Sequence, residues 1–121
     1  MSLERRREII NIDVAEDYNE APIWAVQGEY NSLELDIRVS QKGKLIDLTD
    51  TQFIFKARRS DGYVERVELR DGSSIVVIPE TLFWREGEVT CDVTIHDVGN
   101  WITVKTPMFK MHVLASIMDD E

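Results

Sequence analysis

The residues with the clearest chemical potential are Cys91, His96, Asp97 and His112. Thiolate, imidazole and carboxylate groups bind zinc when three or four of them surround one point. Strand alternation places Cys91 and His96 on opposite faces, and neither histidine has a partner at a spacing typical of zinc ligands. We therefore interpret both histidines as exposed side chains, and the sequence predicts no metal site.

Acidic residues on predicted strands raise the question of general acid–base catalysis. The candidates are Glu34, Asp36, Asp92 and Asp97. This chemistry needs two carboxyl groups held in different environments, whereas alternation places most of these residues on solvated strand faces. The chain also lacks a G-x-S-x-G elbow, a phosphate-binding glycine loop and a calcium-loop pattern. The sequence therefore predicts neither an enzyme nor a cofactor.

Length and charge limit the remaining function classes. The 121 residues suit one domain, expected to span 1–121, and the 14 Lys and Arg against 23 Asp and Glu give a net charge of −9. That sign disfavours nucleic acid, whose phosphates attract basic proteins. No apolar run approaches the roughly 18 residues of a membrane span, and the charged start lacks the apolar core of a secretory signal. We expect neither a nucleic acid nor a membrane as partner.

The elements that must position any site are short strands. Apolar and polar residues alternate most clearly in residues 32–39, 51–59, 88–96 and 109–113. Weaker strands are predicted at 9–14, 63–69, 74–78 and 101–104, with glycine turns between them and one helical turn within 80–86. Residues 20–30 show little alternation and are not predicted as a strand. Regularly spaced short strands indicate an all-β sandwich or barrel.

Basic and aromatic residues near the N-terminus form a candidate interface. Residues 1–8 are expected to form a mobile arm, in which the arginines either keep the arm soluble, the interpretation we favour, or pair with an acidic neighbour. Trp24 follows Pro22 and is equally suited to the core or to anchoring an interface, since tryptophan is enriched in both. The candidate interface comprises Arg5, Arg6, Arg7, Tyr18, Trp24 and Tyr30.

Four other apolar side chains are expected to be inside. Trp84 and Trp101 lie beside predicted strands and are expected to cap the core. Leu45 and Leu48 follow the Lys42-Gly43 turn and are expected to pack under the sheet. Residues 117–121 are expected to be a frayed tail.

The order of several short phrases resembles one family. These phrases are Gln27-Gly28-Glu29, Gly43-Lys44 followed by Asp47-Leu48-Thr49, Phe53 to Phe55, Asp61-Gly62, Gly87 with Val89 to Ile95, and Phe109 to Val113. In this order and spacing they resemble the N-terminal domain of phage baseplate upper proteins. The resemblance extends from about Ile9 to Ser116.

This resemblance implies both a fold and a role. The fold would be an immunoglobulin-like antiparallel β-sandwich of about seven to nine short strands. The role would be that of a structural, non-catalytic attachment module in a phage or prophage tail, made in the bacterial host cytoplasm and incorporated into the virion. The implied partners are a tail hub or receptor-binding protein, with a homo-oligomer left open. The alternative is a carbohydrate-binding or adhesion module, because fold alone does not separate the two.

Overall fold

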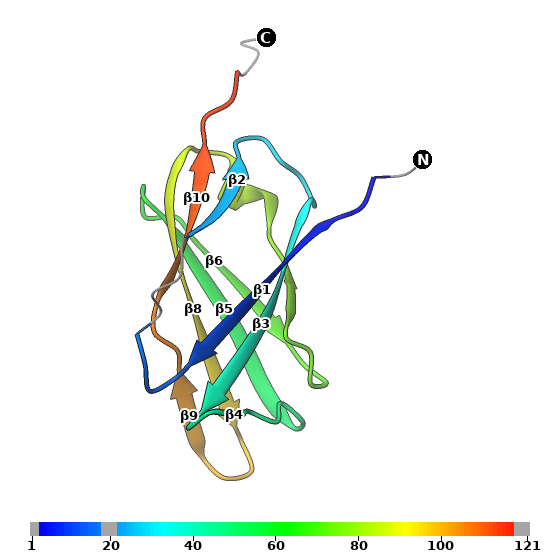
Figure 1. The fold of residues 1–121 in the computed structure, drawn as a ribbon, viewed down its shortest axis with the longest axis vertical. Coiled ribbons are helices and arrows are strands. Elements are labelled where there is room, and N and C mark those ends of the chain that lie inside the picture. Colours follow the sequence, from blue (N-terminus) through cyan, green and yellow to red (C-terminus); the bar gives the residue numbers. More distant parts are fainter. Residues whose placement is uncertain (1–2, 18–21, 118–121) are drawn as a thin grey trace.

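The chain forms two β-sheets that face each other across one hydrophobic core (Figure 1). A computed structural model describes residues 3–17 and 22–117. These residues contain ten strands and one turn of 3-10 helix. They are β1 (Arg6–Asp13), β2 (Ile23–Val26), β3 (Leu33–Gln41), β4 (Lys44–Leu45), β5 (Thr51–Arg59), β6 (Val64–Leu69), β7 (Ile75–Val77), η1 (Glu80–Phe83), β8 (Gly87–Asp97), β9 (Ile102–Lys105) and β10 (Phe109–Leu114).

Both sheets are mixed. In the first sheet, β3 pairs in parallel with β1 on one side and antiparallel with β4 and β7 on the other. The second sheet has the order β2-β10-β8-β5-β6, and β9 pairs with the C-terminal part of β8, from Thr94 to Asp97. Within it β2 and β10 are parallel, while the other pairs are antiparallel. The chain therefore crosses repeatedly between the two layers.

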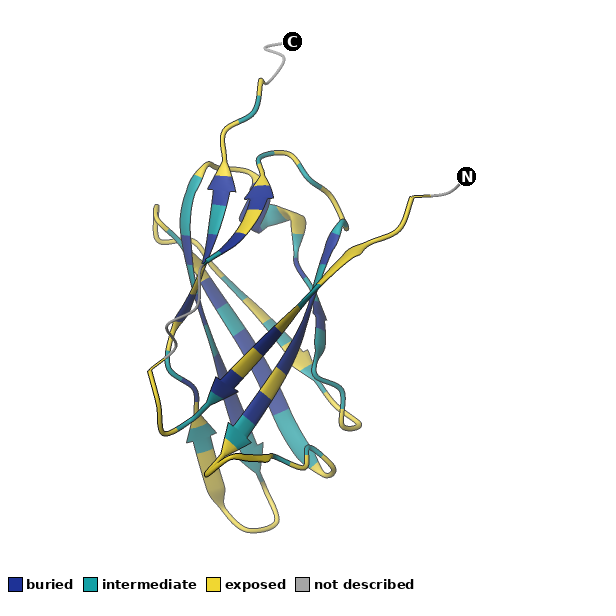
Figure 2. Cartoon of the chain, viewed as in Figure 1, coloured by how far each residue is buried: buried dark blue, intermediate teal, exposed yellow. Residues whose placement is uncertain are grey.

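Alternating side chains build the core between the sheets. Along β3, β5 and β8, buried residues recur at every second position, as the banding in Figure 2 shows. Phe55 of β5 and Phe109 of β10 are fully buried, and their ring centroids lie 6.4 Å apart. The core residues of β8 are Val89, Cys91, Val93 and Ile95. The period-two pattern of the sequence therefore corresponds to the inner face of the sandwich.

The predicted all-β sandwich and all eight predicted strand regions are confirmed, with two corrections. The sheets are mixed and not antiparallel throughout, and the described residues contain ten strands because β2 and β4 were not predicted. In β2, which lies within the segment we expected to lack a strand, Ile23 and Ala25 are buried while Trp24 and Val26 are exposed. Four residues are too short a run for this alternation to stand out.

The turn after Gly43 packs differently from the expectation. Leu45 lies in the two-residue strand β4 at the sheet margin and its side chain is 65% exposed, so its predicted burial was wrong. Leu48 is partly buried and packs against the core as expected. Ile46, which was not predicted to do so, also packs against the core, so the stretch contributes Ile46 and Leu48 to the sandwich and not Leu45 and Leu48.

The N-terminal segment is largely part of the fold. Strand β1 begins at Arg6, so residues 6–8 of the expected arm pair with Leu33, Glu34 and Leu35 of β3. Most of the expected frayed tail, residues 118–121, lies outside the described residues. The described ends of the chain both leave the sandwich at its upper end in Figure 1, the N-terminal one from the start of β1 and the C-terminal one from the tip of β10.

Arg59 fixes the loops at this end. Its guanidinium group donates to both carboxylate oxygens of Asp61, at 2.9 and 2.7 Å, and to the backbone carbonyl of Thr81, at 2.8 Å. It also lies 4.3 Å from the ring centroid of Tyr63. The hydrogen bonds from Arg59 lower the pKa of the Asp61 carboxyl group. This network joins the β5–β6 turn to η1.

Candidate docking surface

Four of the predicted interface residues gather where β1 begins and β2 ends. Arg5 donates through Nε to the backbone carbonyl of Asn31, at 3.1 Å, and Arg6 donates through Nη2 to the carbonyl of Trp24, at 2.7 Å. Tyr30 precedes Asn31 in the loop between β2 and β3, and its side chain is exposed. Two arginines and two aromatic side chains from three chain segments therefore share one end of the sandwich.

Of the other two predicted residues, Arg7 does not join this group. Arg7 follows Arg6 but faces the opposite side of β1, where its Nε atom donates to Oε1 of Glu34 at 2.8 Å. Tyr18 lies outside the described residues. Arg7 therefore belongs to the outer face of the first sheet.

Trp24 lies in an exposed patch formed by two neighbouring strands. The parallel register places Trp24 of β2 beside His112 of β10, and Val26 beside Leu114. The Trp24 side chain is 50% exposed, and its ring centroid lies 4.9 Å from that of His112 at a tilt of 34°. Val26 and Leu114 are also exposed. We call these four residues the Trp24 patch.

The free edge of β2 is blocked by side chains of the same chain. Arg6 occupies the carbonyl of Trp24, and the backbone N–H of Val26 donates to Oε2 of Glu29. The other carboxylate oxygen of Glu29 accepts from the Ser32 hydroxyl at 2.6 Å. Because the Trp24 carbonyl and the Val26 N–H are already engaged, little of the β2 edge is open to strand pairing, and the Trp24 patch offers mainly side chains to a partner.

Gln27 holds three segments together beside the patch. Its Nε2 atom donates to the carbonyl of Trp84 at 3.0 Å, and its Oε1 atom accepts from the N–H of Ser116 at 3.4 Å. The next residue, Gly28, has φ 90° and donates to the carbonyl of Phe83 at 2.9 Å. The loop after β2 is thus tied to η1 and to the segment after β10, which makes this end of the molecule preorganised.

Sequence reasoning missed part of this surface and misplaced two tryptophans. Val26, His112 and Leu114 were not predicted to accompany Trp24, although alternation in IWAV and FKMHVL places them on one face. Trp84 and Trp101 are 57% and 93% exposed, so their predicted role as core caps was wrong. Trp84 follows η1, and Trp101 lies in the turn between β8 and β9 with φ 56°.

The residues considered for catalysis and metal binding are dispersed. Cys91 is buried in the core, whereas His96 hydrogen-bonds through Nδ1 to the Thr103 hydroxyl at 2.8 Å on the other face of β8. Within residues 3–17 and 22–117, no group of three potential metal ligands is present. No helix in the same ranges has the length and apolar composition that a membrane span requires.

Cys91 is expected to be inert in the folded protein. Burial, and secondarily the negative charge of Asp92, raise the pKa of the Cys91 thiol. At about pH 8.5, near the pKa of a free thiol, iodoacetamide should modify the unfolded chain and leave the native protein intact, as mass spectrometry would show. Because only the unfolded chain then releases the thiol proton, the free energy of unfolding should fall as the pH rises further. Labelling of native protein at the free-thiol rate would contradict this assignment.

Comparisons with known proteins place this fold in a family. The family model of the BppU N-terminal domain matches residues 7–121. The solved structure of the N-terminal domain of phage TP901-1 ORF48 has a TM-score of 0.68 and 16% sequence identity, covering 89% of this chain and 98% of that one. No curated protein matches the chain significantly. The structural likeness supports the fold, and the family match extends over almost the whole sequence. The chain belongs to the BppU N-terminal domain family, whose members are structural, non-catalytic domains of phage baseplate upper proteins.

Proposed function

We propose that this domain attaches its protein to a neighbouring tail or baseplate protein through the Trp24 patch. The observation that carries the proposal is a half-exposed tryptophan held on a rigid strand pair, with Val26 and Leu114 exposed beside it. Tryptophan is enriched among the residues that dominate binding energy in protein interfaces. Buried Ile23 and Ala25 anchor β2 in the sandwich, so the ring is presented in a defined orientation.

The arginines beside the Trp24 patch suit a partner whose surface carries acidic or polar groups around the contact. Arg5 and Arg6 lie next to it, although the chain as a whole carries a net charge of −9. Both arginines use one guanidinium N–H group, Nε of Arg5 and Nη2 of Arg6, to bond a carbonyl, which holds each exposed side chain in place and leaves its other N–H groups for a partner. Rim charges of this kind act mainly on the association rate and on partner choice. Tyr30 precedes Asn31 and adds an exposed aromatic ring to the loop that Arg5 contacts.

The proposed partners are a tail hub or a receptor-binding protein, and the proposed setting is the tail of the virion after synthesis in the host cytoplasm. We further propose that residues 1–121 form one domain and that its sandwich is a variant of the immunoglobulin-like fold. The facing sheets and the repeated crossing of the chain between them support this description. The parallel placements of β1 and β2 are the features that set this variant apart.

The direct test is association with the cognate tail hub protein. The purified domain and hub, mixed and analysed by size-exclusion chromatography with light scattering, are expected to elute as a stable complex. Rim arginines should make complex formation faster at low salt, because charges at the rim are screened by ions. Separate elution of hub and domain at every salt concentration would overturn the proposal for the hub, and the same assay with the receptor-binding protein tests the second partner.

A carbohydrate-binding role is the alternative that one observation favours. Sugar-binding platforms use exposed aromatic rings, and Trp24, Trp84 and Trp101 are all exposed. Titration with soluble cell-wall glycans, followed by tryptophan fluorescence, separates the two functions. We expect unchanged emission with glycans and a change with the hub. A saturable response to a glycan would support the alternative.

A further inference from the structure

Strand β1 has the longest one-sided edge in the described part of the chain. It pairs with β3 over eight residues, from Arg6 opposite Leu33 to Asp13 opposite Ser40, and no described strand pairs with its other side. The register is unbroken, and β1 contains neither proline nor glycine. Natural edge strands are commonly shortened, bulged or interrupted by proline to prevent pairing, and β1 carries none of these devices.

The backbone direction shows which residues face the open edge. Arg6 donates its N–H to Ser32 and Val14 donates to Ser40, at 2.8 and 2.9 Å, so the even-numbered residues of β1 bond to β3. Along a strand the backbone groups of successive residues point to opposite sides. The N–H and C=O groups of the odd-numbered residues therefore point outward. These residues are Arg7, Ile9, Asn11 and Asp13, and the side chains of the first three are exposed.

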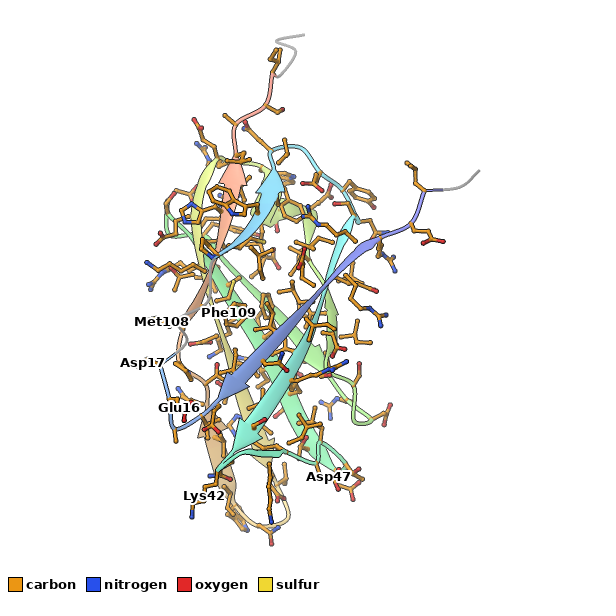
Figure 3. All side chains as sticks on the ribbon, in the orientation of Figure 1. Glu16, Asp17, Lys42, Asp47, Met108 and Phe109 are labelled. Carbon is orange, nitrogen blue, oxygen red and sulfur yellow. The ribbon has the colours of Figure 1, made fainter. Side chains whose placement is uncertain are left out.

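Charge along β1 is polarised from one end to the other. Three arginines stand at its start beside Glu4 and Glu8, of which Glu8 lies 3.9 Å from Arg6, so this end carries a net charge of 3 − 2 = +1. Three acidic residues and no basic one stand at its end or in the turn that follows, where Figure 3 labels Glu16 and Asp17. A second β1 running antiparallel would place each basic end against an acidic end, whereas a parallel copy would place like charges together. The residues concerned are Arg5, Arg6 and Arg7 at the start, and Asp13, Glu16 and Asp17 at the end.

We propose that β1 pairs antiparallel with β1 of a second copy of this chain, joining the first sheets of two sandwiches about a two-fold axis at Ile10. Only registers that set odd-numbered residues against each other bring the outward groups of both strands together. The register centred on Ile10 uses all four of them, with Arg7 opposite the partner's Asp13 and Ile9 opposite the partner's Asn11. Because the contact is isologous, it closes at two copies and does not propagate. It uses a surface other than the Trp24 patch and goes beyond the proposed function.

The side chains that would meet are positioned for this contact. Arg7 donates to Glu34 through Nε, which leaves its two Nη groups for a second carboxylate. The carboxylate oxygens of Asp13 accept from the N–H groups of Ala15 and Gly43, at 2.9 and 3.2 Å, and each oxygen has a further lone pair. Both side chains are thus held at the strand ends where the partner's charges would lie.

Charge exchange tests the pairing and its register. In sedimentation equilibrium, the full chain should dimerise between micromolar and millimolar concentration. Arg7→Asp or Asp13→Arg alone should raise the dimer dissociation constant at least about tenfold, since each substitution creates two like-charge pairs in the dimer. An equimolar mixture of the two variants should restore it, because both cross-strand pairs are then complementary. A monomeric wild type, variants that dimerise as strongly as wild type, or folded variants whose mixture does not recover would overturn the proposal.

A second variant keeps the test independent of the charged residues. Ile9→Pro removes an outward N–H that β3 does not use and should abolish the dimer while circular dichroism stays native, with Ile9→Ala as the matched control for the lost side chain. A dimer that survives Ile9→Pro would exclude pairing through β1. Hub binding is measured separately at the Trp24 patch, so failure of the dimer leaves the proposed function standing.

Discussion

Phe55→Ala should lower the free energy of unfolding by about 3–5 kcal/mol, the usual cost of removing a fully buried aromatic ring. Phe55 has 0% exposure and occupies the middle of β5, which pairs with β6 on one side and β8 on the other. Its ring packs with Phe109 from β10, so truncation leaves a cavity between strands that cannot close independently. Urea denaturation followed by far-ultraviolet circular dichroism measures the loss.

Trp101→Ala is the matched control for this stability measurement. Trp101 is also a large aromatic residue, but its side chain is 93% exposed in the β8–β9 turn. Its replacement should change the free energy of unfolding by no more than about 0.5 kcal/mol. Equal losses in Phe55→Ala and Trp101→Ala would mean that the core is not centred on β5.

Trp24→Ala should weaken binding to the tail hub by about 30- to 1000-fold, the effect of removing a dominant interface residue of 2–4 kcal/mol. The ring is half exposed and rests on His112, so a partner can cover its free side while β10 supports the other. Isothermal titration of the hub with wild-type and variant domains measures the change. The variant should stay folded, because Ile23 and Ala25, and not Trp24, anchor β2 in the core.

Point variants test hub binding through the Trp24 patch better than removal of the N-terminal segment does. Removal of residues 1–22 would delete β1, whose Ile10 and Ile12 are buried in the core and whose whole length pairs with β3. A loss of hub binding after such a deletion would then report damage to the sandwich. Arg5→Ala, by contrast, removes a rim charge that precedes the first strand, and Arg6→Ala also frees the carbonyl of Trp24.

The strands could be predicted because alternation is local. In the segments around Ile37, Phe55, Val93 and Met111, the alternation of apolar and polar residues indicates which face of the strand is buried. The structure places those apolar faces inward. Strand direction is a different matter. Parallel and antiparallel neighbours can share the same alternation of apolar and polar residues. The sequence of each strand therefore does not show that β1 pairs in parallel with β3, or β2 with β10.

The candidate surface was predicted in part for a related reason. Arg5, Arg6, Trp24 and Tyr30 were chosen for their chemical types, but their gathering depends on contacts between distant segments, such as Arg6 with the carbonyl of Trp24. Trp101 lies in the β8–β9 turn at the far end of the sandwich, and its side chain is 93% exposed (Figure 1). Residue type suggested burial for that ring, whereas its position in a turn between two strands leaves it in solvent.

The most direct test of the account is the ratio of the hub dissociation constants of Trp24→Ala and Trp101→Ala. The two tryptophans lie at opposite ends of the sandwich, since Trp24 is near the tips of β2 and β10 and the β8–β9 turn is at the far end (Figure 1). Attachment through the Trp24 patch predicts a ratio of about 30 or more, with Trp101→Ala binding like wild type. A ratio near one, with both variants folded and wild type bound, would contradict docking through this surface.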